Sequence, residues 1–282
     1  MKSVSLAVGG ARLNRIPYFD IAIDPELIGL DAAQVAQIPW AEPVWADEHG
    51  LVRFGQAVWI VESQGVRIAV DPCGATDEFL RTGSSAFEHQ ESVAHALEHG
   101  GFSPDSIDIV WLSHLDGIGM TARVDADGSW SPMFPNARVV IGAEHLAWSR
   151  AQPERFDVAA FDALCRDHDV LDAVSFPHSL TNEIELHETG AHAPGHAIAW
   201  IRSQAECAVM LGHLAVSPLH IVTGPCTTLH VDAHAAWEVL GAVIGQAQRE
   251  AAIVIGPLWP NPGAGHVGED RSLTPVLHEA SA

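Results

Sequence analysis

The sequence predicts a single α/β domain in which two β-sheets pack face to face and helices cover the outside. Three observations support this prediction. Hydrophobic residues make up 48% of the 282 positions, enough for a large core. The apolar segments occur as hairpin-like pairs of strands separated by long helices. No repeat, low-complexity segment or linker divides the chain, so residues 1–282 are expected to form one domain.

The N-terminal part contains the first hairpin and the first long helix. Prolines interrupt residues 1–50, which predicts an extended N-terminal segment with one short helix at 31–38. Residues 51–72 alternate in polarity around a Ser-Gln-Gly turn, a pattern typical of a β-hairpin. Residues 86–100 have helical spacing and end at two glycines. An apolar strand then leads to His114.

The rest of the chain alternates between strands and helices. Helices are predicted after residue 142, with a break at Pro153, and at 232–250, where Ala236, Leu240, Val243, Ile244 and Ala247 share one face. The Gly- and Pro-rich residues 256–270 are predicted to form a loop. Two strands joined by a Ser-Gln turn are expected within 189–213, and the other strands at 138–142, 170–175, 183–188 and 251–257.

Charge and composition limit the partners of this chain. The formal net charge is −22, from 36 acidic and 14 basic residues, so nucleic acids and anionic membranes would be repelled. No apolar run approaches 18 residues, and the N-terminus lacks a secretory signal, so a cytoplasmic protein is expected. The four cysteines have no Cys-x-x-Cys spacing and are expected to be reduced core residues. A small molecule is the expected partner, and a homodimer is left open.

Several of the 17 histidines stand where strands end. His114 follows an apolar strand, and Asp116 comes two residues later. His192 lies in the string Gly-Ala-His-Ala-Pro-Gly-His, and His213 ends another apolar run. Loops at one edge of a sheet converge, and histidine is the commonest metal ligand. The spacing therefore indicates a shared metal site.

The order of these motifs resembles that of the metallo-β-lactamase fold superfamily from residue 40 to residue 268. Ser-His-Leu-Asp-Gly at 113–117 stands where that superfamily has its first histidine-rich motif, and the string around His192 matches the second closely. Residues 209–218 match the third motif, and 253–267 match the region of the last histidine. The resemblance implies a four-layer αβ/βα sandwich and a metal-dependent hydrolase.

The departures from the superfamily pattern point to a reduced metal site. Only His114 and Asp116 remain in the first motif, the usual bridging aspartate is replaced by His213, and Leu258 stands where the last histidine would be. A dinuclear site cannot be assembled from these positions. The predicted metal ligands are His114, Asp116, His192 and His213, with zinc as the expected metal and iron or manganese as alternatives.

The predicted function is hydrolysis of a small ester, lactone or related substrate. Three protein ligands would leave a position for water, whereas four would close a tetrahedral zinc site. His114 and Asp116 are the predicted catalytic residues. Two alternatives stay open: a metal-free protein that binds or senses a small molecule, and an enzyme in which His114 and Asp116 act as an acid–base pair without metal.

The remaining polar residues are expected to have supporting or surface roles. Asp71, at the end of the first hairpin, is expected to form a turn or to orient a ligand. His196 is expected to support the site rather than bind metal. His266 could reach the position that Leu258 leaves without a histidine. Surface or loop positions are expected for His220, His230, His234 and His266, and a solvated helix face for His89, His95 and His99.

Overall fold

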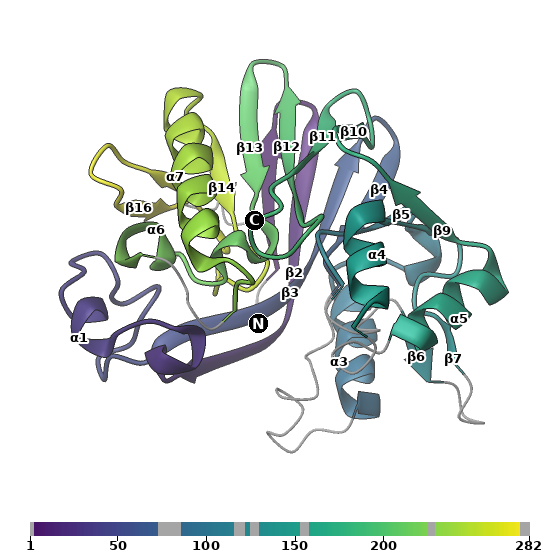
Figure 1. The fold of residues 1–282 in the computed structure, drawn as a ribbon, viewed down its shortest axis with the longest axis horizontal. Coiled ribbons are helices and arrows are strands. Elements are labelled where there is room, and N and C mark those ends of the chain that lie inside the picture. The colour runs from purple at the N-terminus through teal and green to yellow at the C-terminus, as the bar shows by residue number, and fades with distance from the viewer. Residues whose placement is uncertain are drawn as a thin grey trace.

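The computed structural model describes residues 3–72, 86–115, 122–124, 130–152, 158–224 and 229–276. Two seven-stranded sheets lie in the middle of the molecule and helices cover the outer face of each (Figure 1). The predicted four-layer αβ/βα sandwich of the α+β type is confirmed. No helix in the described ranges is long and apolar enough to cross a membrane.

The first sheet combines an antiparallel and a parallel half. Its strands, in spatial order, are β1 (Val4–Val8), β2 (Ala11–Ile23), β3 (Val52–Ser63), β4 (Val66–Val70), β5 (Ile109–Leu112), β8 (Arg138–Gly142) and β9 (Leu171–Val174). Strands β1 to β4 pair antiparallel, and β4, β5, β8 and β9 pair parallel. The outer helices are α3 (Ala86–His99), α4 (Ala143–Arg150) and α5 (Val158–His168), and β6 (Ala122–Val124) and β7 (Trp130–Pro132) form a separate ribbon (Figure 1).

The second sheet is antiparallel except where β13 pairs with β14. Its strands are β10 (His178–Ser179), β11 (Ile184–Glu188), β12 (Ala197–Ser203), β13 (Glu206–Met210), β14 (Ile253–Ile255), β15 (Ala264–Val267) and β16 (Leu273–Pro275). Its outer side carries α7 (Ala233–Arg249) and α6 (His220–Thr223), with α1 (Ala32–Val35) beyond them (Figure 1). The five residues predicted for the apolar face of α7 are all buried.

The core forms three layers that match this architecture. Trp59 and Trp111 of the first sheet pack with Met210 and Ile255 of the second, between the sheets. A second cluster lies between the first sheet and its helices, and a third lies between the second sheet, α7 and the segment around Trp45. Burial of each large apolar side chain contributes about 1.5–3 kcal/mol to the free energy of folding. Packing of these layers therefore holds the strand ends in fixed positions relative to one another.

Two predictions of irregular structure differ from what the structure contains. Residues 4–23 were expected to be part of an extended segment, but they form a hairpin that pairs with β3 from Arg12 to Ile23, with a register shift at Pro17. Residues 256–270 were expected to be a loop, but β15 lies within them. A Cβ on Gly265 would lie 2.7 Å from the Thr274 carbonyl oxygen, so glycine here permits close strand pairing.

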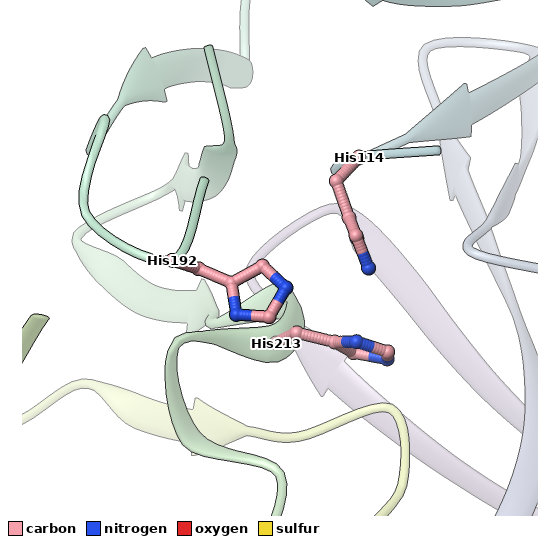
Figure 2. A group of neighbouring side chains, drawn as sticks. All are labelled: His114, His192 and His213. Carbon is pink, nitrogen blue, oxygen red and sulfur yellow. The ribbon is translucent and has the colours of Figure 1, made fainter. Parts of the chain in front are cut away.

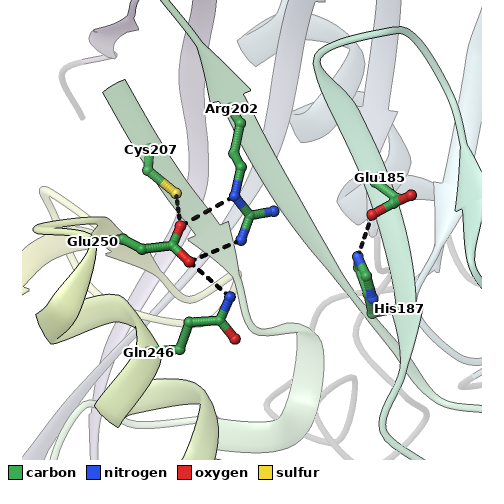
Figure 3. A network of polar contacts seen from close by, with 6 residues as sticks. All are labelled: Glu185, His187, Arg202, Cys207, Gln246 and Glu250. Atoms are coloured by element: carbon green, nitrogen blue, oxygen red, sulfur yellow. Dashed lines mark hydrogen bonds and ion pairs between the residues drawn. The ribbon is translucent and has the colours of Figure 1, made fainter. Parts of the chain in front are cut away.

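Polar contacts fasten α7 to the second sheet (Figure 3). The Glu250 carboxylate, just after α7, accepts hydrogen bonds from both Nε and Nη2 of Arg202, from Gln246 and from the Cys207 thiol. On β11, His187 pairs with Glu185 at 2.6 Å. Cys165 and Cys207 are free thiols; Cys165 is buried in the core, as predicted, and Cys207 is only partly buried. Cys73 and Cys226 lie outside the described residues.

Candidate metal centre

His114 is held at the end of β5 by the neighbouring strand β4. The backbone N–H of Ser113 donates to Asp71 Oδ1 at 2.7 Å, and the backbone N–H of Asp71 donates to the Trp111 carbonyl oxygen. Asp71 has a φ of 39°, an uncommon conformation for a non-glycine residue, which turns its carboxylate back onto the strand end. Ser113 Oγ lies 3.1 Å from His114 Nδ1. Asp71 therefore orients the segment that carries His114, as the sequence suggested.

His192 lies in the loop between β11 and β12. The loop closes with a hydrogen bond from the His196 N–H to the Ala193 carbonyl oxygen, and the Ala197 N–H donates to the Ser113 carbonyl oxygen. The backbone of His192 is fixed in turn, because its carbonyl oxygen accepts from the Val231 N–H at 2.8 Å. This loop of the second sheet is thus fastened to the strand end of the first.

His213 follows β13 and occupies the start of a short 3-10 helix, Gly212–Ala215. Gly212 has a φ of 53°, and a Cβ there would lie 2.7 Å from both His196 Nε2 and Ser113 Oγ. Only glycine lets the end of β13 approach Ser113 so closely. That close approach brings His213 to the same place as His114.

The three histidines converge from three different segments (Figure 2). One ring nitrogen from each lies within 4.8 Å of the other two, and all three residues are buried. The ring centroids of His114 and His213 are 4.2 Å apart, and those of His114 and His192 are 4.8 Å apart. Nitrogens around a tetrahedral zinc at about 2.0–2.1 Å would lie about 3.4 Å apart, so small side-chain movements would complete the coordination.

Two of the ring nitrogens in this cluster have no other use among the described residues. His114 Nε2 and His213 Nε2 are buried and have no hydrogen-bond partner there. A buried imidazole nitrogen without a partner is costly, and coordination of a metal would satisfy it. Zn²⁺ fits this donor set, because three imidazoles form a known type of zinc site with a fourth position open.

Burial favours the neutral form of His114 and His192, as metal binding requires. The pKa of His114 and that of His192 lie well below the ordinary value, first because burial penalises the charged ring and then because other histidines lie close by. The pKa of His196 is lowered in the same way. Neutral imidazole is the form that binds metal, so these rings would need no deprotonation at pH 7.

Two further histidines support the segments that carry the cluster. His145, in α4, accepts a hydrogen bond at Nε2 from the Leu115 N–H and donates from Nδ1 to the Pro194 carbonyl oxygen. His196 hydrogen-bonds Thr189 Oγ1 through Nδ1 and packs beside Gly212. His196 thus has the supporting position that the sequence suggested. The sequence analysis missed His145, although it comes three residues after β8, whose end lies beside the end of β5.

Of the four histidines predicted at the surface or in loops, two are exposed and two are not. His230 was expected on a surface loop, but it is half-buried and its Nδ1 lies 3.0 Å from His192 Nδ1. His220 is buried, where it accepts from the Ser217 N–H and donates to the Ile28 carbonyl oxygen. His266 is exposed on β15, so it does not fill the position of Leu258. His234 is exposed and pairs with Glu238, as predicted.

The predicted ligand Asp116 and the residue that replaces the last histidine, Leu258, are not part of the described cluster. Asp116 lies outside the described residues, so its role as a metal ligand or catalytic group stays a prediction. Leu258 is buried in the apolar core, and its carbonyl oxygen accepts from the Gly55 N–H. Trp259 beside it donates to the Ala215 carbonyl oxygen and packs edge-on against Trp45.

Comparison with known proteins identifies the fold. No family model and no curated protein sequence matches the chain. Among solved structures, the hydrolase AbOPH of the beta lactamase superfamily superposes with a TM-score of 0.75 at 17% identity, over 99% of this chain and 98% of that one. The chain has the metallo-β-lactamase fold.

Two more structures with this fold are similar over nearly the full length. The dizinc quorum-quenching lactonase AidC, solved with a product, matches with a TM-score of 0.73 at 19% identity, over 99% of this chain and 98% of that one. A probable metal-dependent hydrolase from Staphylococcus aureus matches with a TM-score of 0.70 at 15% identity, over 98% and 100% of the two chains. These similarities establish the metallo-β-lactamase fold.

Proposed function

We propose that this protein is a metal-dependent hydrolase of a small ester or lactone, with one zinc ion held by His114, His192 and His213. The observation that carries the proposal is the convergence of three buried imidazoles, one from each of three segments. Two of them present Nε2 atoms that have no hydrogen-bond partner in the described part of the chain. Three imidazole ligands with an open fourth position are the arrangement of a catalytic zinc, not of a closed structural one.

A single ion fits this chain better than a pair. A second ion would need a bridging carboxylate and a further histidine, but His213 and Leu258 stand at those positions in the superfamily pattern. An imidazole nitrogen that has bound one ion has no second lone pair with which to bridge another. Leu258 lies in the apolar core, where it offers no donor atom.

Each residue of the centre has a definable task in such a reaction. When bound, zinc would polarise the substrate carbonyl and lower the pKa of a water at its open position. His114, His192 and His213 would hold the ion, and burial lowers the pKa of His114 and His192, which favours the neutral imidazole that binds metal. Asp71 and His145 would keep the segments around His114 from moving, which fixes the geometry of attack.

The substrate class rests on the acidic surface and on the neighbours. A net charge of −22 disfavours nucleic acids and other polyanions as substrates. The similar protein AidC is a lactonase whose structure contains N-hexanoyl-homoserine, so lactones are the first compounds to screen. Small neutral esters follow, because the same attack on a carbonyl carbon would cleave them.

Metal analysis tests this proposal. Wild type, His192→Ala and the exposed control His266→Ala would be purified without chelator or metal-affinity resin and analysed for zinc, iron and manganese. We expect about one equivalent of zinc in wild type and in His266→Ala, and a loss in His192→Ala. Absence of metal from wild type after dialysis against excess Zn²⁺ would refute the proposal and favour a metal-free small-molecule binding protein. Two equivalents would refute the mononuclear site.

A further inference from the structure

Among the described residues, His230 makes a polar contact to the ring of His192 from outside the segment that carries His192. Its Nδ1 lies 3.0 Å from Nδ1 of His192, although the two residues are 38 positions apart. The ring planes meet at 88°, with centroids 5.1 Å apart. Next to this contact, the Val231 N–H donates to the His192 carbonyl oxygen at 2.8 Å. Residues 230–231 thus hold both the backbone and the ring of His192.

The 3.0 Å contact between two Nδ1 atoms requires one proton between them. Two protonated nitrogens would bring two hydrogens face to face, and two bare nitrogens would bring two lone pairs together. One ring must therefore donate and the other accept. Which ring donates decides which nitrogen of His192 is left to bind metal.

We infer that His230 is a positioning residue that accepts the Nδ1 proton of His192 and thereby keeps Nε2 of His192 free for the metal. This inference rests on the proposed zinc function. Metal-binding histidines commonly donate their second ring N–H to a carboxylate or a carbonyl oxygen, which fixes the tautomer and the ring orientation. Here a second imidazole takes that place.

A further consequence concerns the outer edge of His230. When His230 Nδ1 accepts, the proton of the neutral ring is on Nε2, so His230 presents a donor there. In the opposite arrangement, Nε2 of His230 would be an acceptor, and Nε2 of His192 would carry the proton and could not bind metal. Metal binding at His192 therefore fixes the hydrogen-bonding character of His230.

Zinc affinity of four proteins tests the inference. Wild type, His230→Ala, His230→Asn and the control His234→Ala would be stripped of metal and titrated with Zn²⁺ against a chromophoric chelator. In His230→Asn, the amide oxygen can stand near the original Nδ1 position and accept the same proton. His234 is exposed and pairs only with Glu238 on α7 among the described contacts.

We expect His230→Ala to bind zinc about 10–100-fold more weakly than wild type, with His230→Asn recovering much of the loss and His234→Ala unchanged. Two-bond ¹H–¹⁵N correlation spectra of zinc-loaded protein labelled at histidine should show the proton of His192 on Nδ1 and that of His230 on Nε2. Unfolding of the metal-free proteins would separate a loss of affinity from a loss of stability.

The outcomes separate the two proposals. Wild-type zinc affinity in His230→Ala, or a proton on Nε2 of zinc-loaded His192, would overturn the role of His230 and leave the zinc hydrolase standing. If wild type itself binds no zinc, the proposed function fails and the role of His230 fails with it. If His230→Asn binds zinc as weakly as His230→Ala does, this result would also contradict a role of His230 as proton acceptor.

Discussion

Replacing His145 by alanine should destabilise the protein strongly without removing any of the three clustered histidines. His145 is fully buried and serves two backbone groups from two different loops. Its Nε2 accepts from the Leu115 N–H at 2.7 Å, and its Nδ1–H donates to the Pro194 carbonyl oxygen at 2.9 Å. Alanine would leave the buried Leu115 N–H and the part-buried Pro194 carbonyl oxygen without these partners.

The magnitude follows from those two groups. An unsatisfied buried donor or acceptor costs about 1–3 kcal/mol, so loss of the partner of the Leu115 N–H alone costs about that much. The unpaired Pro194 carbonyl oxygen and the vacated ring volume add to this. The partly exposed His187 gives a matched control, because its pair with Glu185 lies at the surface and is worth about 0.2–1 kcal/mol. His145→Ala should therefore lose several times as much stability as His187→Ala.

Urea unfolding of metal-free protein measures this difference. Removal of metal beforehand keeps ligand binding from contributing to the free energy of unfolding. We expect the midpoint to fall sharply in His145→Ala and to change little in His187→Ala, with similar slopes. If the two variants unfold within about 1 kcal/mol of each other, the bridging role of His145 is refuted.

Three further predictions follow from other contacts. Burial lowers the pKa of His220 to about 4, so below pH 6.5 the unfolded chain takes up a proton that the folded one does not. Because of this residue, the free energy of unfolding should fall by about 1.4 kcal/mol per pH unit from pH 6.5 towards 4. In urea titrations at several pH values, His220→Gln should remove that part of the pH dependence. Gly195→Ala should lower the free energy of unfolding by about 1–3 kcal/mol more than Gly190→Ala, as measured by thermal or urea unfolding. Both glycines have positive φ, but only at Gly195 would a Cβ lie 2.2 Å from a backbone nitrogen of α4, so equal losses of stability would contradict this prediction. Burial and the Glu250 contact raise the pKa of Cys207 to about 12, so alkylation of this thiol at pH 8 should be slow. Peptide mass spectrometry should show faster alkylation in Glu250→Gln, and an unchanged rate would contradict the effect of that contact.

Elements with strong local patterns could be predicted closely. The hairpin of β3 and β4 and the buried face of α7 agree with their predicted positions, because alternation and helical periodicity are properties of consecutive residues. The N-terminal hairpin and β15 could not be predicted in the same way. Proline and glycine usually indicate loops, and only pairing with β3 and β14 makes strands of these segments.

The same distinction between local patterns and tertiary pairing applies to the candidate site. The sequence predicted the types of the candidate ligands and their places, because His114, His192 and His213 each follow or adjoin a strand in a recognisable order. It also determined what is missing, since Leu258 has no donor atom whatever the fold does. These are properties of residue identity, so no coordinates were needed to see them.

Only the tertiary structure decided which nitrogens meet and which residues hold them in place. Sheet pairing and the close approach at Gly212 bring three distant histidines within 4.8 Å, and the same packing sets His145 and His230 beside them. His192 and His230 are 38 residues apart, with no shared local pattern. Such contacts arise from how two sheets and their loops pack, and the spacing of residues along the chain does not predict that packing.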